Sequence, residues 1–484
     1  MGGNMEAIQS RIRANDMQID SEIINELISA HDTGAMSEGM RYYRSKSDIV
    51  DRKMYFYDNN GDKQQDDIKE NHKLVNNWHK LLVDQKVSYL VGKPMVFSVE
   101  NTDESHKKAF SEKIELLLGD EWDDTVADIA TNASNKGTEW LHVCIDKNGY
   151  FKYTIAPAEQ IIPVYDSATQ QNLEGVLRFY PVEIDGAGRN RVEWWTRDNV
   201  TIYIEGGDGG FELDNTETDN PAPHYKRNNT AQGWGKVPFI EFPNNSFRTN
   251  DLEVTKSLID EYDRSISDFA NNNAEVQETI LILKGYEATE LSSFKENLRY
   301  FKTIKLRPDN HSGVDKLEFN IPYESKRELL DRLEENIFIF GQGVNVKTDR
   351  FGNSPSGASL EFLYTSLDLK ASMMERKFRR SVKRLLWFAT KYIRMEFNLS
   401  GDNIDIKAFF RKNMVQNNKE IVDMLKDSRD MISDETIVSL YPLIENTGHE
   451  YQKLLEQRKA YARATVDLAQ NPDNIDLTGI DIHE

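Results

Sequence analysis

The 484-residue sequence predicts a mixed α+β protein, in which helices and strands occupy separate stretches of the chain. Apolar residues recur every three or four positions in several long segments, which is typical of amphipathic helices. Between 138 and 245 they instead alternate with polar residues, which is typical of strands. Two long helical patterns near the middle of the chain are separated by a stretch rich in Gly, Asn and Ser at 341–357.

The N-terminal part of the chain is expected to be mainly helical. A helix is predicted over 20–31, with Asp20 or Ser21 as its capping residue. The next helix is predicted over about 66–91, because its apolar residues keep a three-to-four spacing. These residues are Leu74, Trp78, Leu81, Leu82, Val87 and Leu90.

A strand at 96–100 and a helix over 103–135 lead into the β-rich region. That region begins with a predicted hairpin over 138–156, whose turn carries the dipeptide Asn148-Gly149. Further strands are predicted for GVLRFYPVEI, NRVEWWTRDN, VTIYIEG and VPFIEFP.

The second half of the chain is predicted to be built on long helices. Amphipathic patterns cover 251–277 and 323–341, and a small insert of strands and one helix lies between them. After the Gly-rich stretch, about 357–397 reads as one helix without internal Gly or Pro, on the order of 60 Å long. A strand within IDIKAFFRKNM and a helical stretch over 417–468, broken at Ser433 and Pro442, complete the chain.

The charge balance excludes some partners. With 81 acidic and 60 basic side chains the formal net charge is −21, so the average field repels phosphate and anionic membranes. The single cysteine, Cys144, excludes an intrachain disulfide and suits a reducing cytoplasm. No apolar run approaches the roughly 18 residues of a membrane span, and the N-terminus lacks the apolar core of a secretory signal.

Motifs that support catalysis are missing. The nine His residues show no zinc-protease spacing, and no phosphate-binding loop of the Walker type occurs. The GQGVNV sequence follows a helix and lacks the third Gly of a dinucleotide site. The stretch Asp58–Asp62 resembles a calcium loop only in composition, so we expect a β-turn there. The sequence therefore predicts no catalytic residues, no metal and no cofactor.

A run of positive charge stands out on the long helix. Between Lys370 and Arg394 there are nine cations and one acid, Glu375. At 100° per residue, five of the cations cluster on one side, namely Arg376, Arg380, Lys383, Lys391 and Arg394. The run is compatible with a solvated face, with contact to an acidic neighbouring subunit, or with contact to DNA.

Taken in order, these elements resemble the portal proteins of tailed bacteriophages, in the branch found in phages of Gram-positive hosts. VDQKVSYLVGKPMVFSVE at 83–100 is similar to that family's wing-helix signature. The helix–insert–helix over 251–341 resembles its stem, clip and stem. GQGVNVKTDRFGNSPSGASLEF and the helix after it resemble its tunnel loop and tunnel helix.

The resemblance implies a ring subunit of portal type and assigns a role to each part of the chain. The implied parts are a wing at 1–250, stem helices at 251–277 and 322–341, a clip at 278–321, a tunnel loop at 342–357, a tunnel helix at 358–397, a helical crown at 398–470 and a mobile acidic tail at 471–484.

The resemblance also implies site residues. Tunnel loops would project into a central channel, where their DNA-channel residues are Asn345, Lys347, Thr348, Arg350, Asn353 and Ser354, with Gly343, Gly352 and Gly357 providing flexibility. Candidates for the contact between subunits are Tyr262, Leu333, Ile337, Arg376, Arg380, Lys383 and Arg384, although purely intrachain packing is an alternative for the apolar ones. Candidates for docking the packaging motor are Lys295, Lys302, Lys305 and Arg307.

The implied partners are other copies of the chain, twelve in the virion, and double-stranded DNA bound without sequence preference. Terminase, a head-completion or adaptor protein, and the major capsid and scaffolding proteins complete the set. The implied location is one capsid vertex of the virion, after assembly in the host cytoplasm. Two alternatives remain open on the sequence alone: a scaffolding or filament-forming protein built on long helices, and a nucleic-acid-processing enzyme.

Overall fold

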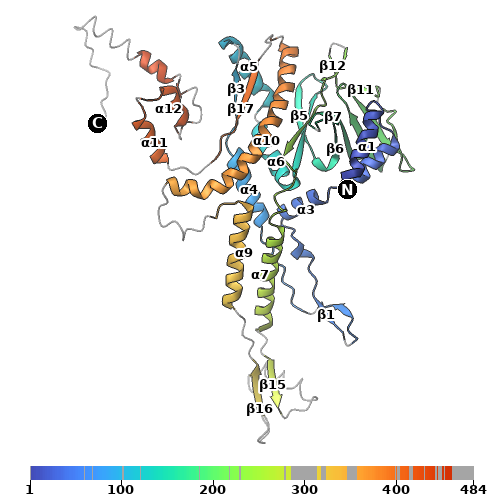
Figure 1. Ribbon diagram of the computed structural model, residues 1–484, viewed down its shortest axis with the longest axis vertical. Helices are drawn as coiled ribbons and strands as arrows, with labels where there is room; N and C mark the ends of the chain where they lie inside the picture. The colour runs from blue at the N-terminus through green and yellow to red at the C-terminus, as the bar shows by residue number, and fades with distance from the viewer. Residues whose placement is uncertain are drawn as a thin grey trace, which may run out of the picture. The chain divides into compact units, whose positions relative to one another are not determined.

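The computed structural model describes most of the chain. The described residues are 2–276, except 59, 68, 101–102, 120, 170, 185, 217–218 and 228–229, then 280–284, 313–317, 323–345, 357–397, 399, 404–413, 418–429, 431–441, 444, 450–451 and 453–460. The chain divides into one unit of residues 1–345 with 366–413, and a second unit of residues 346–365 with 414–484. The mixture of helices and strands confirms the predicted α+β class (Figure 1).

The largest sheet is antiparallel and is formed by the alternating stretch of the sequence. Five of its strands are joined in the order β10-β9-β8-β7-β6, and β11 pairs with β9. The bounds are β6 Ile161–Tyr165, β7 Leu173–Ile184, β8 Ala187–Trp195, β9 Asn199–Glu205, β10 Phe211–Leu213 and β11 Ala222–Pro223. A separate short pair, β12 Tyr225–Arg227 with β13 Thr230–Gln232, follows.

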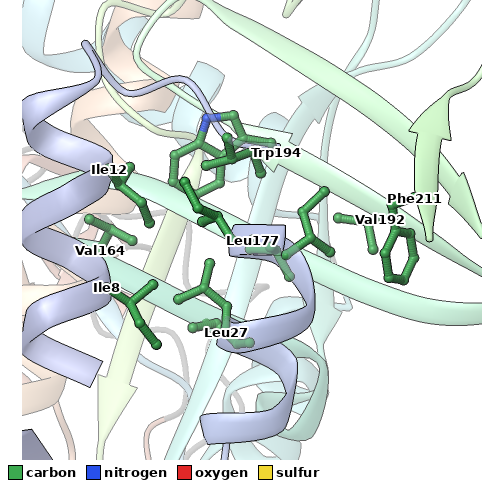
Figure 2. Packing of buried hydrophobic residues seen from close by; sticks show 12 residues of the cluster. Ile8, Ile12, Leu27, Val164, Leu177, Val192, Trp194 and Phe211 are labelled. Atoms are coloured by element: carbon green, nitrogen blue, oxygen red, sulfur yellow. The ribbon is translucent and has the colours of Figure 1, made fainter. Parts of the chain in front are cut away.

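Two N-terminal helices pack on this sheet. Helices α1 (Gly2–Ala14) and α2 (Ser21–Ala30) place Ile8, Ile12 and Leu27 against strand residues such as Leu177 and Trp194 (Figure 2). Burial of these side chains stabilises the sheet by removing apolar surface from water. The Asp20 carboxylate accepts a hydrogen bond from the Ile23 N–H, which confirms the first of the two predicted caps of α2.

A second sheet, in the order β14-β4-β5, contains the predicted hairpin. Its strands are β4 Thr138–Ile145, β5 Phe151–Ala156 and β14 Phe239–Pro243. Gly149 has φ +88°, which the turn between β4 and β5 requires and a side chain would resist. The predicted helix over 103–135 is two helices, α5 Glu104–Leu118 and α6 Trp122–Lys136, because Gly119 between them takes a φ of +65°.

Strand β3 pairs with a strand from the far end of the same unit. β3 covers Val96–Glu100 and runs antiparallel to β17, Asp405–Phe409, with Val96 opposite Phe409 and Glu100 opposite Asp405. Both strands were predicted, but their pairing was not.

Helix α4 begins later than the spacing of apolar residues suggested. It covers Trp78–Val91, so the prediction of a helix from residue 66 is wrong for 66–77. Residues 70–77 form neither helix nor strand, and side chains of another helix bind their backbone. Asn271, Ser267 and Asp263 of α7 (Lys256–Val276) accept hydrogen bonds from the N–H groups of His72, Leu74 and Asn76, at 2.7, 3.0 and 2.9 Å.

Helix α7 lies beside α9, Tyr323–Gly341 (Figure 1). Their shared core also involves α4, because the Trp78 ring lies 5.3 Å from Tyr262 and 5.6 Å from Phe338. In the insert between the two helices, β15 Ile280–Lys284 pairs with β16 Gly313–Leu317. The remaining short elements of this unit are α3 Gly34–Tyr43, β1 Tyr55–Tyr57, β2 Lys63–Gln65 and the 3-10 turns Asp48–Asp51 and Ala158–Gln160.

The long helix is α10, Gly357–Phe397, which agrees with the predicted range of about 357–397. From residue 366 it belongs to the first unit, where it buries one apolar stripe containing Met374, Phe378, Val382, Leu385, Ala389 and Ile393. In the second unit, the predicted helical stretch contains α11 (Asn418–Asp427) and α12 (Asp434–Leu440). Ser433 caps α12, so the predicted break at this residue is confirmed.

Candidate functional site

The segment after α9 is tied to α4 before it leaves the described region. The Gln85 side-chain amide donates to the Val344 carbonyl at 2.9 Å, and its oxygen accepts from the Val344 N–H at 3.0 Å. Val344 is buried, so these bonds satisfy backbone groups that water does not reach. The described part of the segment therefore has a fixed starting direction up to Asn345.

Two glycines allow this close approach to α4. A Cβ atom on Gly341 would lie 2.5 Å from a methyl carbon of Leu82, and one on Gly343 would lie 2.3 Å from the other methyl carbon. Because Leu82 is itself buried, it has little room to move away. Gly343, which was predicted to give flexibility, packs closely on Leu82 in the structure.

A buried ionic cluster, which we call the pin, joins this segment to α10. The Asp251 carboxylate, just before α7, lies 2.6 Å from the Lys86 ammonium of α4 and 3.3 Å from the Lys370 ammonium of α10. Lys370 also donates to the Gly341 carbonyl at 2.9 Å, and Lys86 donates to Asn244 at 2.8 Å. The pin therefore connects α4 and α10 with two chain segments: Asn244, just after β14, and Gly341, at the end of α9.

The charges of the pin depend on one another. Burial lowers the pKa of Lys86, and the nearby Asp251 only partly offsets this effect. Burial alone would raise the pKa of Asp251, but Lys370 and Lys86 more than compensate and keep that pKa below its usual range. Removal of Asp251 would leave the ammonium groups of Lys86 and Lys370 without the carboxylate that they share.

Most predicted channel residues fall outside the part of the chain that the structure describes. These are Lys347, Thr348, Arg350, Gly352, Asn353 and Ser354, and so are the motor-docking candidates Lys295, Lys302, Lys305 and Arg307. Asn345 is described and is half-buried, and Gly357 is the first residue of α10.

The apolar interface candidates lie in the chain's own core. Leu333 and Ile337 are buried, and Tyr262 is partly buried against the same cluster. Because Ile337 exposes no side-chain surface, its position fits packing within the chain, which was the alternative to contact between subunits.

The basic interface candidates share one exposed face of α10. Arg376, Arg380 and Lys383 are exposed, and Arg384 is half-buried. This face borders a groove of about 730 Å³, whose lining contains six cations and one acidic residue, Asp405. The cations are Lys236, Arg380, Lys383, Arg384, Lys391 and Arg394.

The cations of this basic groove crowd one another. Burial, followed by the charges of Arg384 and Lys391, lowers the pKa of Lys236. Burial and the neighbouring Arg380 likewise lower the pKa of Arg384. Lys236 also lies 3.9 Å above the Trp387 ring, which partly stabilises its charge. A groove with this charge distribution suits an anionic partner.

Comparison with known proteins identifies the family. The model of the family described as "Phage portal protein, SPP1 Gp6-like" matches residues 26–464, which include α4, the pin and the whole of α10. The chain belongs to the SPP1-like family of phage portal proteins. Portal proteins are structural components of the virion rather than enzymes.

Two portal proteins are similar over almost their entire length. The portal protein of Bacillus phage SPP1 is 34% identical over 451 residues, which cover 92% of this chain and 87% of the relative. The portal protein of Clostridium phage phiCD119 is 29% identical over 449 residues, covering 87% and 95%.

Among solved structures, the chain is similar to chains from necks of GTA particles. One, from an empty particle computed with C6 symmetry, has a TM-score of 0.44 and 9% identity, covering 75% of this chain and 90% of that one. Another, from a native particle computed with C12 symmetry, has a TM-score of 0.39 and 10% identity, covering 76% and 90%. Within the described residues of the portal chain, no helix combines the length and apolar character needed to cross a membrane.

Sequence reasoning missed the residues that hold this site together. Gln85 and Lys86 lie within 83–100, but no local pattern distinguishes them from their neighbours. Asp251 lies at the expected start of a helix, where a carboxylate is ordinarily a cap. Their contacts join residues 119 or more positions apart in the chain, which no local pattern reveals.

Proposed function

We propose that this chain forms a closed ring at one capsid vertex, through which double-stranded DNA enters during packaging and leaves during ejection. The single observation that carries this proposal is the family match over residues 26–464, because it includes the stem-like helices, the segment after Gly341 and α10 together. The proposed ring has twelve copies in the virion.

The segment 342–357 of each copy lines the narrowest part of the channel in this proposal. Lys347 and Arg350 offer contacts to phosphate, and Asp349 weakens them. A few cations per copy give a weak, salt-sensitive grip, which a sliding duplex needs. The net charge of −21 per copy keeps DNA centred by repulsion.

The anchored start of the segment supports this role. Gln85 and the pin fix the backbone at 341–344, so that a force on the segment reaches the body of the subunit and does not unravel α9. Contact with DNA then begins beyond Asn345. Seven of the nine residues from 346 to 354 are Gly, Asn, Ser, Thr or charged residues, which offer little apolar surface for tight binding.

Assembly of the ring requires local attraction between copies that repel each other at long range. We assign this attraction to the exposed basic face of α10 and the basic groove that it borders. Arg376, Arg380, Lys383 and Arg384 face an acidic surface of the neighbouring copy in this proposal. Opposite charges brought together at an interface give specificity and set the register between copies.

The insert at 278–321 is the proposed docking surface for terminase and then for head-completion proteins, with Lys295, Lys302, Lys305 and Arg307 as contacts. The wing faces the major capsid and scaffolding proteins. Assembly takes place in the host cytoplasm, before the virion is complete.

Electron microscopy of the purified protein, combined with light scattering, tests the ring. Closed rings with a central hole are expected, and fibres or compact monomers would contradict the proposal. A second test replaces 346–356 by a short Gly-Ser linker and leaves the anchored residues in place. Rings should persist while DNA packaging is lost, and normal packaging by this variant would exclude the proposed channel segment.

A further inference from the structure

The hairpin of β1 and β2 exposes three consecutive aromatic side chains. Tyr55, Phe56 and Tyr57 are 48%, 47% and 72% exposed. Every residue of both strands is exposed, so neither face of the hairpin is covered by the described part of the chain. Successive side chains of a strand point to opposite faces, so Phe56 and the two tyrosines provide apolar surface on both sides.

The hairpin is nevertheless well formed. The Asp58 carboxylate accepts hydrogen bonds from the N–H groups of Asn60 and Asp62, each at 2.9 Å, which closes the turn. The Lys63 ammonium lies 4.0 Å above the Tyr55 ring, across the two strands. A two-stranded hairpin with no core is at best marginally stable in water. A hairpin that is already formed loses little conformational entropy when it binds, so this element suits contact with a partner.

The base of the hairpin is fixed to α7. Arg52, just before β1, forms an ion pair with Asp268 of α7. After β2, the Asn71 side chain donates to the Arg52 carbonyl at 3.1 Å, and the His72 N–H donates to Asn271 of α7 at 2.7 Å. Both ends of the hairpin are thus held, and its direction relative to α7 is set.

The hairpin and α9 lie on opposite sides of α7. Tyr262 and Phe269 of α7 face α9, whereas Asp263, Ser267 and Asn271 face the chain that carries the hairpin. At 100° per residue these two sets occupy opposite sides of the helix. Figure 1 shows the same order, with α7 between α9 and the chain leading to β1.

Two exposed apolar side chains of α9 lie near the height of the hairpin base. Tyr323 and Leu329 are 57% and 45% exposed. The Tyr323 ring lies 5.9 Å from Phe269, the neighbour in sequence of the Asp268 that pairs with Arg52. The hairpin thus projects from one side of α7, and α9, on the other side of α7, carries exposed apolar side chains at the same level.

We propose that the hairpin is a clasp: Tyr55, Phe56 and Tyr57 of one copy pack on α9 of the next copy, around Tyr323 and Leu329. This inference rests on the proposed ring. A rotation about an axis along the helices keeps each element at its height, so the hairpin of one copy meets α9 of its neighbour. Such a head-to-tail contact uses two different surfaces of the same chain, as a ring requires.

DNA does not suit this surface. Between 51 and 67 the chain has five acidic and three basic residues, so the hairpin region repels phosphate. A protein surface with exposed apolar side chains fits it better, and a second copy presents one at the required height.

Photo-crosslinking of the assembled protein tests the clasp. Tyr57 is replaced by the photo-crosslinking residue p-benzoylphenylalanine, rings are isolated and irradiated, and the crosslinked peptides are identified by mass spectrometry. Covalent dimers are expected, with the adduct between 323 and 333 of the partner copy. The matched control carries the same residue at Tyr150, which is also 64% exposed, and should give no adduct on α9.

A double substitution, Phe56→Ser with Tyr57→Ser, provides a second measurement. Both side chains are exposed, so the fold should persist, while the fraction of protein in rings should fall at least tenfold at low protein concentration. Rings that form with adducts elsewhere, or an unchanged ring fraction in the double variant, would overturn the clasp and leave the ring intact. Failure of the unmodified protein to form any ring would instead contradict the proposed function.

Discussion

Gln85 and Val344 lie 259 positions apart in the sequence, yet they form a closed pair of hydrogen bonds, with lengths of 2.9 and 3.0 Å. This pair fixes the point from which the proposed channel segment leaves the body of the subunit. A single side chain of α4 thus holds the backbone next to the proposed channel segment, which makes Gln85 a direct target for mutation.

We expect Gln85→Leu to release this backbone. The substitution leaves the buried N–H and C=O of Val344 without partners, which costs about 1–3 kcal/mol for each group. Amide hydrogen exchange at 341–345 should become faster, while exchange in the large sheet should not change. Gln85→Glu keeps the acceptor but loses the donor, so its effect should be intermediate. Unchanged protection at 341–345 in Gln85→Leu would show that the pair does not hold the segment.

The pin should be more sensitive at Asp251 than at Lys86. Asp251→Asn preserves shape but leaves the buried Lys86 and the partly buried Lys370 without their shared counter-charge. Loss of a partner from a buried ion pair costs about 3–5 kcal/mol. Lys86→Met should cost less, because Asp251 still pairs with Lys370. Thermal unfolding of both variants shows which of them loses more stability. If Asp251→Asn is as stable as Lys86→Met, the paired charges do not stabilise the fold as proposed.

His142 should make the protein sensitive to acid. Burial, with smaller contributions from Arg178 and His224, lowers its pKa to about 3, well below the ordinary value near 6.5. The unfolded chain therefore binds a proton as the pH falls below 6.5, whereas the folded chain does not until about pH 3. Stability from neutral His142 is thus present above pH 6.5 and lost as the pH falls towards 3. Between pH 8 and pH 5 the loss is about 2 kcal/mol.

His142→Phe removes the imidazole that takes up a proton in the unfolded chain. An aromatic ring still stacks on Phe239, whose ring centroid lies 4.5 Å from that of His142. Denaturant unfolding at pH 8 and pH 5 should show a smaller difference between the two conditions in the variant than in the natural protein. An equal difference in both proteins would assign the acid sensitivity to other groups.

Charge reversal in the basic groove should disrupt assembly. Arg380→Glu combined with Lys383→Glu replaces two exposed cations by acids and should turn attraction to an acidic neighbour into repulsion. Mass photometry at low salt should then show monomers. Lys108→Glu, at another exposed position, changes charge in the same sense and should leave rings intact. Rings of normal abundance in the double variant would remove the basic groove from the interface between copies.

Local patterns predicted the elements whose contacts are close in sequence. The hairpin over 138–156 follows from alternation and Asn148-Gly149, and α10 follows from a long stretch without Gly or Pro. The same reasoning failed at 66–77, where Leu74 fits a helical stripe but its N–H is bound by Ser267. A partner 193 positions away decides that conformation, so no local window contains the information.

The candidate site also combines features that local sequence predicts with features that depend on distant contacts. The sequence predicted the basic face of α10, because a run of cations is visible in the composition. The channel role of 342–357 stays a prediction. The sequence did not predict that Gly343 packs on Leu82, nor that Lys86, Asp251 and Lys370 meet. These contacts depend on tertiary packing, and Lys370 therefore appeared only as one more cation of the run.

The pairing of β3 with β17 has a consequence for biosynthesis. Val96–Glu100 gains its only described strand partner from Asp405–Phe409, which the ribosome adds after more than three hundred further residues. A nascent chain that stops early therefore keeps an open strand edge and an incomplete body. Truncated translation products should be poor substrates for assembly, so the time at which β17 emerges helps to ensure that only finished chains enter the particle.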